Sequence, residues 1–136
     1  MLATQKGLGY MRKSLYLGIA LGGGLGSCFR FGVSSLLTAN EGGFPYGTLA
    51  VNLIGCMLLS FFYQILSSAN GKAEVLHKAL TTGFIGSFTT FSAFTAEFAQ
   101  LYNETPSLAS YYIFATVVGG LGMTIAGHLW GRRWKK

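Results

Sequence analysis

Charged residues are scarce in this sequence. Of its 136 residues only 10% are charged, and four are acidic. Hydrophobic residues make up 51% of the chain, and the mean hydropathy is +0.46. Such a composition excludes an ordinary soluble domain. The sequence therefore predicts a protein that resides in a lipid bilayer.

Cysteine is also rare, and several chemical signatures are missing. Cys28 and Cys56 both fall in apolar stretches without disulfide or metal-site spacing, so we interpret them as small packing residues. There is no nucleotide-binding glycine loop, and no carboxylate lies in the middle of an apolar stretch. These absences disfavour a nucleotide-driven pump and a proton-coupled antiporter. The pI near 9.6 does not indicate a nucleic-acid partner, because the basic residues flank apolar stretches.

Long apolar stretches are what the sequence has instead. A helix that crosses a bilayer needs ~20 mostly apolar residues. Three stretches exceed that length, and the third in chain order reaches it only by running past Glu97 to about Leu101. The prediction is one all-α membrane domain, residues 1–136, with four transmembrane helices. Their approximate spans are 14–38, 46–67, 78–101 with a break around 86–90, and 108–130.

Basic residues are distributed very unevenly around these spans. Nine of the ten fall on the side that holds both termini, and the tenth, Arg30, lies within the first span. The positive-inside rule then predicts cytoplasmic termini. The nine are Lys6, Arg12, Lys13, Lys72, Lys78, Arg132, Arg133, Lys135 and Lys136.

The third span contains the unusual segment GFIGSFTTFSAF, residues 83–94. Its phenylalanines continue a helical spacing that on periodicity alone indicates a packing stripe. Poor helix formers crowd the same segment and predict a break, whose carbonyl groups would need protein, water or a cation as partners. The stripe is Phe84, Phe88, Phe91, Phe94 and Phe98; the poor helix formers are Gly83, Gly86, Ser87, Thr89 and Thr90.

Other spans carry isolated polar groups. Arg30 follows a glycine stripe at Gly18, Gly22 and Gly26, which we interpret as a helix-packing face. The arginine either points inward toward a partner or an anion path, or extends to the interface. In the second span Thr48 and Asn52 are stacked four residues apart, and both can donate hydrogen bonds to an anion. Thr116 in the last span lies deep enough for a functional role.

Three motifs, in this order and spacing, are shared with a known family: GGGLGSCFRF from Gly22, GTLAVNLIG from Gly47, and GFIGSFTTFSAF from Gly83. The chain resembles the small bacterial fluoride channels of the Fluc (CrcB-like) type over essentially all four spans. The resemblance implies a channel, not an enzyme, in the bacterial inner membrane. It would confer fluoride resistance by passive export of fluoride, as an antiparallel dimer in lipid with two pores.

The resemblance also implies roles for individual residues. Main-chain carbonyls of Gly86 and Thr89 would hold a structural sodium ion at the dimer interface. Arg30 would lie in an aqueous vestibule and Glu97 near one pore mouth. Ala93 stands where the family usually has threonine, so one hydroxyl is missing from the path. The fluoride pathway would comprise Asn52, Phe91, Phe94, Ser92, Thr48 and, by a looser match, Thr116.

The identity of the partner subunit stays open between two alternatives. A homodimer of opposed subunits requires one sequence to insert both ways, which an even charge balance favours. Because the basic residues of this chain are so unevenly distributed, a homologous partner with the opposite charge distribution is the alternative. The homodimer is slightly favoured, because the implied sodium site uses matched residues on a two-fold axis.

Two other functions are alternatives to a channel. A small multidrug-type exporter would need an acidic residue in the first span, which is absent. A non-transporting scaffold would use the glycines and aromatic rings for packing only.

Overall fold

All regular structure in the described part of the chain is helical. The computed structural model describes the backbone of residues 2–37, 43–66 and 72–134, and the side chains of 13–37, 43–66 and 73–134. No strand occurs in these ranges, so the prediction of an all-α protein is confirmed. Five basic side chains of the charge count lie outside the described residues: Lys6, Arg12, Lys72, Lys135 and Lys136. The elements are α1 Leu2–Leu37, α2 Tyr46–Leu66, α3 Lys72–Lys78, the π-helix η1 Ala79–Ile85, α4 Gly86–Phe88, α5 Phe91–Glu104 and α6 Pro106–Trp134.

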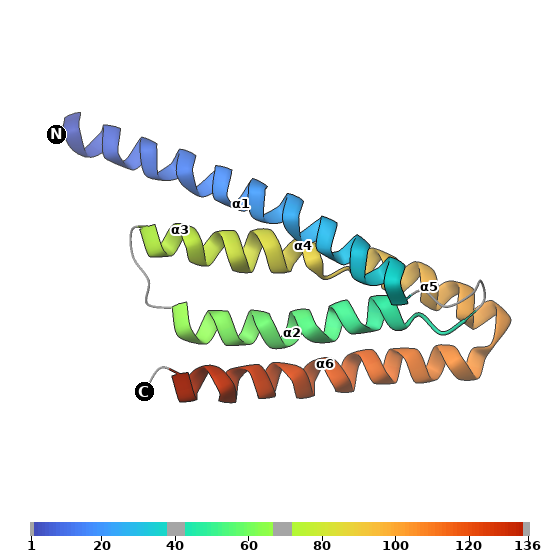
Figure 1. Ribbon diagram of the computed structural model, residues 1–136. Coiled ribbons are helices and arrows are strands. Elements are labelled where there is room, and N and C mark those ends of the chain that lie inside the picture. The colour runs from blue at the N-terminus through green and yellow to red at the C-terminus, as the bar shows by residue number, and fades with distance from the viewer. Residues whose placement is uncertain (1, 38–42, 67–71, 135–136) are drawn as a thin grey trace.

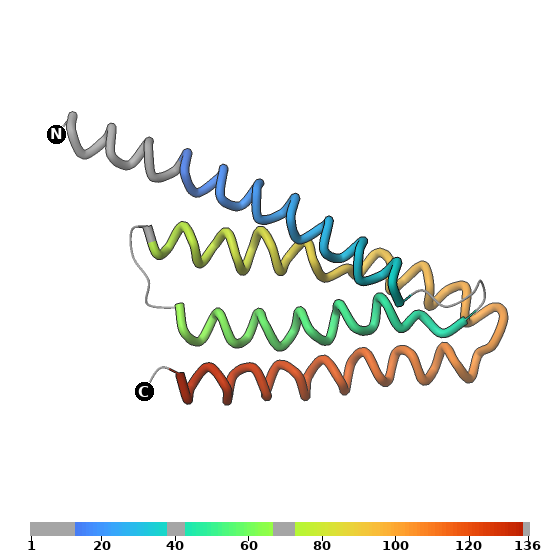
Figure 2. Tube along the Cα trace, viewed as in Figure 1, coloured from blue at the N-terminus to red at the C-terminus, as the bar shows by residue number. Residues whose placement is uncertain are grey.

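The chain runs back and forth along the length of an elongated bundle (Figure 1). Helices α3, η1, α4 and α5 follow one another along a single lengthwise course, and the tube in Figure 2 shows the irregular step within it. Helix α2 packs mainly on α6, while α1 packs on η1 and α4. The ends of α2 and α6 and the start of α3 therefore share one end of the bundle (Figure 1).

The surface of this bundle is apolar. Among the described helices, α2 and α6 are long and apolar enough to cross a membrane. Large apolar side chains are exposed on α1 and α6, including Leu21 at 62% and Leu121 at 63%. Apolar surface of this extent is typical of a protein covered by lipid or by a partner. The helices thus have the character of a membrane protein.

The course from α3 to α5 is interrupted at two residues. Thr89 and Thr90 are extended, with φ and ψ of −77° and 157° and of −147° and 122°. Gly86 is still helical, at φ −61° and ψ −30°. The irregular backbone therefore occupies only the last two residues of the predicted range 86–90. Extended geometry suits these threonines, because their β-branched side chains favour it over a helix.

Three glycines of α1 form its contact with η1. A Cβ atom at Gly22 would overlap the carbonyl oxygen of Ala79, and one at Gly26 would overlap that of Phe84. At Gly18 a Cβ would lie 3.3 Å from the Ala79 Cβ. Absence of side chains thus lets two helix backbones approach closely. The interpretation of this stripe as a packing face is confirmed.

Three phenylalanines of the stripe in the third span are packing residues, as predicted. Phe88 is 5% exposed and stacks on Phe84 with the ring planes 6° apart. Phe84 also meets the ring of Phe29 on α1 edge to face. Phe98 stacks on Phe94, with 6.3 Å between the ring centroids. Phe84 and Phe88 thus pack η1 and α4 against α1, and Phe98 packs against the core cluster through Phe94.

We expect Gly26→Ala to destabilise the protein by about 1–3 kcal/mol, because its methyl group would be forced onto the Phe84 carbonyl. The matched control is Gly24→Ala in the same helix, where a Cβ would meet no atom within 4 Å. Thermal unfolding in detergent would show a lower midpoint for Gly26→Ala only. Equal midpoints for the two variants would contradict this packing account.

Candidate functional site

The side chain of Asn52 on α2 holds the interrupted backbone. The Thr90 N–H donates to Asn52 Oδ1 at 2.8 Å, and Asn52 Nδ2 donates to the Thr90 carbonyl at 3.0 Å. One amide side chain thus satisfies both main-chain groups of Thr90, which have left the helical pattern. The Thr90 hydroxyl accepts from the Ala93 N–H at 3.2 Å and so caps the start of α5. This pairing lets the chain turn without unsatisfied donors at depth in the bundle.

Two carbonyl groups lose their helical partners through these bonds. In a continuous helix the Gly86 carbonyl would accept from the Thr90 N–H, which here donates to Asn52. The Thr89 carbonyl would accept from the Ala93 N–H, which here donates to the Thr90 hydroxyl. Both oxygens are therefore released from the helical ladder. Such oxygens are the ligands that hard cations take in interrupted membrane helices.

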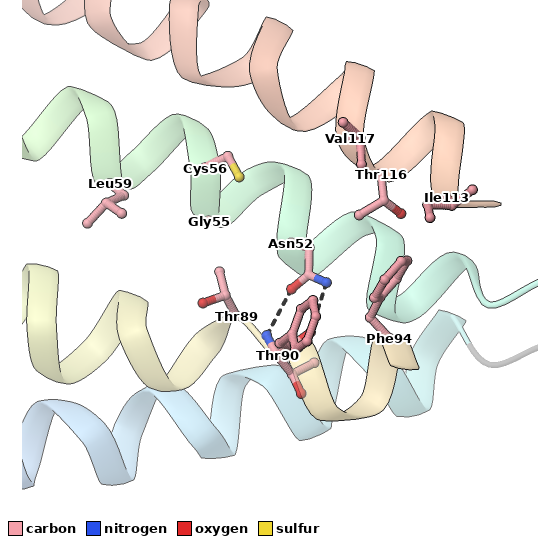
Figure 3. Close-up of a pocket in the computed structure, with 11 residues that line it drawn as sticks. Asn52, Gly55, Cys56, Leu59, Thr89, Thr90, Phe94, Ile113, Thr116 and Val117 are labelled. Atoms are coloured by element: carbon pink, nitrogen blue, oxygen red, sulfur yellow. Dashed lines mark hydrogen bonds between the residues drawn. The ribbon is translucent and has the colours of Figure 1, made fainter. Parts of the chain in front are cut away.

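A cavity of about 510 Å³ lies beside the break (Figure 3). Asn52 and Thr90 approach each other at one side of it, and Thr116 of α6 reaches it from another helix. Most of its wall is apolar, with a few polar groups among the lining side chains. This combination is typical of ligand sites. The lining residues are Asn52, Gly55, Cys56, Leu59, Thr89, Thr90, Phe91, Phe94, Ile113, Thr116 and Val117.

Two phenylalanine rings from the first turn of α5 line the cavity. Phe91 is 77% exposed, whereas Phe94 is 9% exposed and packs on the ring of Tyr112. Their ring centroids are 5.9 Å apart and their planes are inclined by 36°. One ring therefore belongs to the core and its neighbour to the surface. Both rings line the same cavity, and the edge of a phenyl ring carries partial positive charge.

A carboxylate links three helices next to this space. Glu97 on α5 accepts from the Thr48 hydroxyl of α2 at 2.6 Å and from the Tyr112 hydroxyl of α6 at 2.7 Å. Both donors are buried, Thr48 at 4% and Tyr112 at 0% exposure. Short hydrogen bonds to a charged acceptor are the stronger kind. The Thr48 hydroxyl is thus bound to Glu97, and Thr48 does not line the cavity.

Of the remaining predicted residues, some line the cavity and others do not. Thr116 lines it, but its hydroxyl donates to the Tyr112 carbonyl of its own helix at 2.8 Å. Ser92 is exposed, lies outside the lining, and has its hydroxyl 3.3 Å from that of Thr90. Arg30 is half-buried on α1 and forms no ion pair with a described carboxylate. The structure therefore gathers Asn52, Phe91, Phe94 and Thr116 but leaves Ser92, Thr48 and Arg30 outside.

The hydrogen-bonding roles of Thr90 and Tyr112 were not predicted from the sequence. The sequence marks Thr90 only as a poor helix former, yet its N–H donates to Asn52 and its carbonyl accepts from Asn52. Tyr112 lies one helical turn before Thr116 on α6, but nothing in that spacing identifies Glu97 as the acceptor for its hydroxyl. The available signal was Glu97 near the end of its apolar stretch, because a carboxylate among apolar residues requires hydrogen-bond donors.

The sequence matches the model of a known protein family, described as "CrcB-like protein, Camphor Resistance (CrcB)", over residues 17–128. The chain belongs to the CrcB family. The resemblance inferred from the three motifs is therefore confirmed.

Relatives in the CrcB family are named as channels. The chain is 36% identical over 122 residues to "Fluoride-specific ion channel FluC" of Chlorobium phaeobacteroides, covering 89% of this chain and 95% of the relative. It is 42% identical over 116 residues to "Fluoride-specific ion channel FluC 2" of Listeria monocytogenes serotype 4b, covering 85% and 87%. It is 40% identical over 121 residues to the FluC of Paracoccus denitrificans, covering 88% and 96%. The family is one of ion channels and not of enzymes, as the sequence predicted.

We expect Tyr112→Phe to lower stability by about 1–2 kcal/mol, because Glu97 Oε2 loses its buried donor while the ring remains. Tyr111→Phe is the matched control, since that neighbouring tyrosine is 61% exposed. The two variants are compared by thermal unfolding in the same detergent. A Tyr112→Phe protein as stable as the wild type would show that the Glu97 bridge does not stabilise the bundle.

Proposed function

We propose that this chain is a fluoride-selective passive channel that exports fluoride from the cytoplasm. The observation that carries the proposal is the cavity beside the break, where Asn52 and two phenylalanine rings meet. The names of the CrcB-family relatives support fluoride as the permeant ion. Fluoride enters cells as its neutral weak acid and ionises inside. Its own gradient and the inside-negative potential then drive the anion outward.

Selectivity depends on groups that replace the tightly held water of fluoride. An amide nitrogen has two hydrogens, and Asn52 uses one of them for the Thr90 carbonyl. The other is the donor that we assign to fluoride, with the ring edges of Phe91 and Phe94 as secondary partners. Thr116 contributes a hydroxyl oxygen to the wall but donates its proton within α6. The Asn52 amide is thus both a support of the break and a ligand.

The lengthwise bundle and its two long apolar helices support the proposed membrane placement. Four crossings are proposed: α1, α2, the course from α3 to α5, and α6. A second subunit in opposite orientation would cover the exposed ring of Phe91 and close the cavity, which gives two pores per dimer. An identical partner is favoured, because one chain carries every element of the site. The termini are cytoplasmic if the chain inserts in one orientation, and lie on both sides in a homodimer of dual topology. The host membrane is the bacterial inner membrane.

A structural sodium ion at the dimer interface is part of this proposal. Its ligands would be the Gly86 and Thr89 carbonyl oxygens, and the bonds that Asn52 and Thr90 make support this choice by releasing both. The ion would neutralise carbonyl dipoles that protein donors leave unpaired. It supplies no chemistry of transport. Its partners on the second subunit would be the same two residues.

Arg30 and Glu97 lie beyond the cavity wall in this proposal. Arg30 would attract anions into an aqueous vestibule, which its half-buried position without a described ion pair supports. Glu97 would lie near a pore mouth and orient the Thr48 hydroxyl, so Thr48 would reach fluoride only where the anion approaches Glu97. Ser92 would act from the exposed side of the break.

The direct test is fluoride efflux from liposomes that contain this chain expressed and purified alone. Fluoride-selective efflux without a proton gradient is expected, because an identical partner completes both pores. Asn52→Asp should reduce the rate at least about tenfold, since a carboxylate repels the anion and cannot donate to Thr90. Gln64→Glu is the matched control, because it makes the same chemical change near the end of α2, where Gln64 packs on Gly131.

Each outcome of this test has a separate meaning. Absence of efflux from an intact dimer would contradict the proposed channel function. Efflux only after a homologous chain is added would remove the identical partner and keep the function. An Asn52→Asp protein that conducts as fast as Gln64→Glu would remove Asn52 from the pathway.

Removal of sodium should weaken the assembly. Exchange of Na⁺ for N-methylglucamine, which is too large for a site of main-chain oxygens, is expected to lower the thermal midpoint of the wild-type dimer in detergent. Choline chloride at the same ionic strength controls for general salt effects. Restoration of the midpoint by Na⁺ alone supports the ion site, and identical midpoints in all three salts would exclude it.

A further inference from the structure

The last two turns of α6 hold both tryptophans of the chain, Trp130 and Trp134, four residues apart. Phe61 of α2 lies beneath them, with ring centroids 4.6 Å from Trp130 and 6.3 Å from Trp134. Phe61 is buried, whereas Trp130 is 44% and Trp134 71% exposed. A buried ring therefore supports two indoles that face the surroundings of the bundle. Indole rings prefer the headgroup level of a bilayer.

Unpaired positive charge lies between these rings in the sequence. Arg132 and Arg133 are exposed, and neither forms an ion pair with a described carboxylate. Neither α2 nor α6 contains an acidic residue. At the same end of the bundle, Glu74 of α3 is already paired with Lys78 at 2.9 Å. No described acidic side chain is thus available to neutralise the two arginines.

The helix dipole is a simpler explanation for arginines in a last turn. It does not explain the two tryptophans beside them or the support from Phe61. Arginine forms bidentate hydrogen bonds with phosphate, and the indole N–H is a further donor at the same level. Anionic lipid headgroups attract basic residues next to a membrane span. Charge and aromatic groups therefore match the same partner.

We propose that Trp130, Trp134 and Arg133, with Phe61 as the buried support of the indoles and Arg132 on the other side of the helix end, together form an α6-end surface that binds the headgroups of anionic phospholipids. The arginines hold phosphate groups of the lipids around this end. The tryptophans pack against the start of the acyl chains. None of these residues lines the cavity beside the break, and the binding of lipid does not depend on fluoride conduction.

The chain offers a specific probe, because its two tryptophans both belong to this surface. The full-length protein is placed in symmetric vesicles of equal phosphatidylglycerol and phosphatidylcholine, and only the choice of which lipid is brominated differs between samples. Quenching of tryptophan fluorescence by brominated phosphatidylglycerol should exceed that by brominated phosphatidylcholine at least about twofold. Arg132→Gln combined with Arg133→Gln should bring the ratio to one. Symmetric vesicles give the same result for either orientation of the protein.

Lys13→Gln combined with Lys78→Gln is the matched control, because it removes the same net charge from α1 and α3. This control should keep the wild-type ratio. Equal quenching by the two lipids in the wild type would overturn the proposal. An equal loss of preference in both double variants would also overturn it, because the preference would then come from the overall charge of this end and not from the α6-end surface.

Discussion

The paired hydrogen bonds between Asn52 and Thr90 are the interaction on which the rest of the site depends. An interrupted helix in an apolar bundle exposes main-chain groups that neither lipid nor apolar side chains can satisfy. A single side-chain amide meets this requirement, because it presents a donor and an acceptor at the spacing of one peptide unit. The position of α5 relative to α4 is therefore fixed from α2. The two phenylalanines that follow the break take their places beside the cavity as a result.

A second polar connection joins α5 to α2 and α6. Glu97 receives hydroxyl donors from α2 and α6, so both helices that pack most extensively on each other are also joined through α5. The core here is formed by Phe94, Leu101, Ala109 and Tyr112. Apolar packing and the Glu97 hydrogen bonds thus coincide at Tyr112. Two sets of polar hydrogen bonds, one at Thr90 and one at Glu97, therefore hold α5 in a largely apolar bundle.

The sequence predicted the helical class, the packing glycines of α1 and the interruption near Thr89, because composition and local residue preference determine these features. It did not predict that Gly86 stays helical. Glycine permits a break without requiring one, and the donor that Thr90 finds in Asn52 sets the position. It also did not reveal the partner of Thr48, since a contact between residues 49 positions apart depends on how α2 and α5 pack. Local patterns thus indicated which residues are polar and deep, and tertiary structure decided which of them meet.

The π-helix η1 immediately before α4 sets the rotation of everything that follows it. A π-type hydrogen bond spans one residue more than an α-type bond. An α-helical course over the same segment would turn the following residues by about 100° around the axis. The main-chain groups of Thr90 would then no longer face Asn52. The π-helix η1 packs against the glycine face of α1. Its wide turn therefore determines the direction in which the residues of the site point.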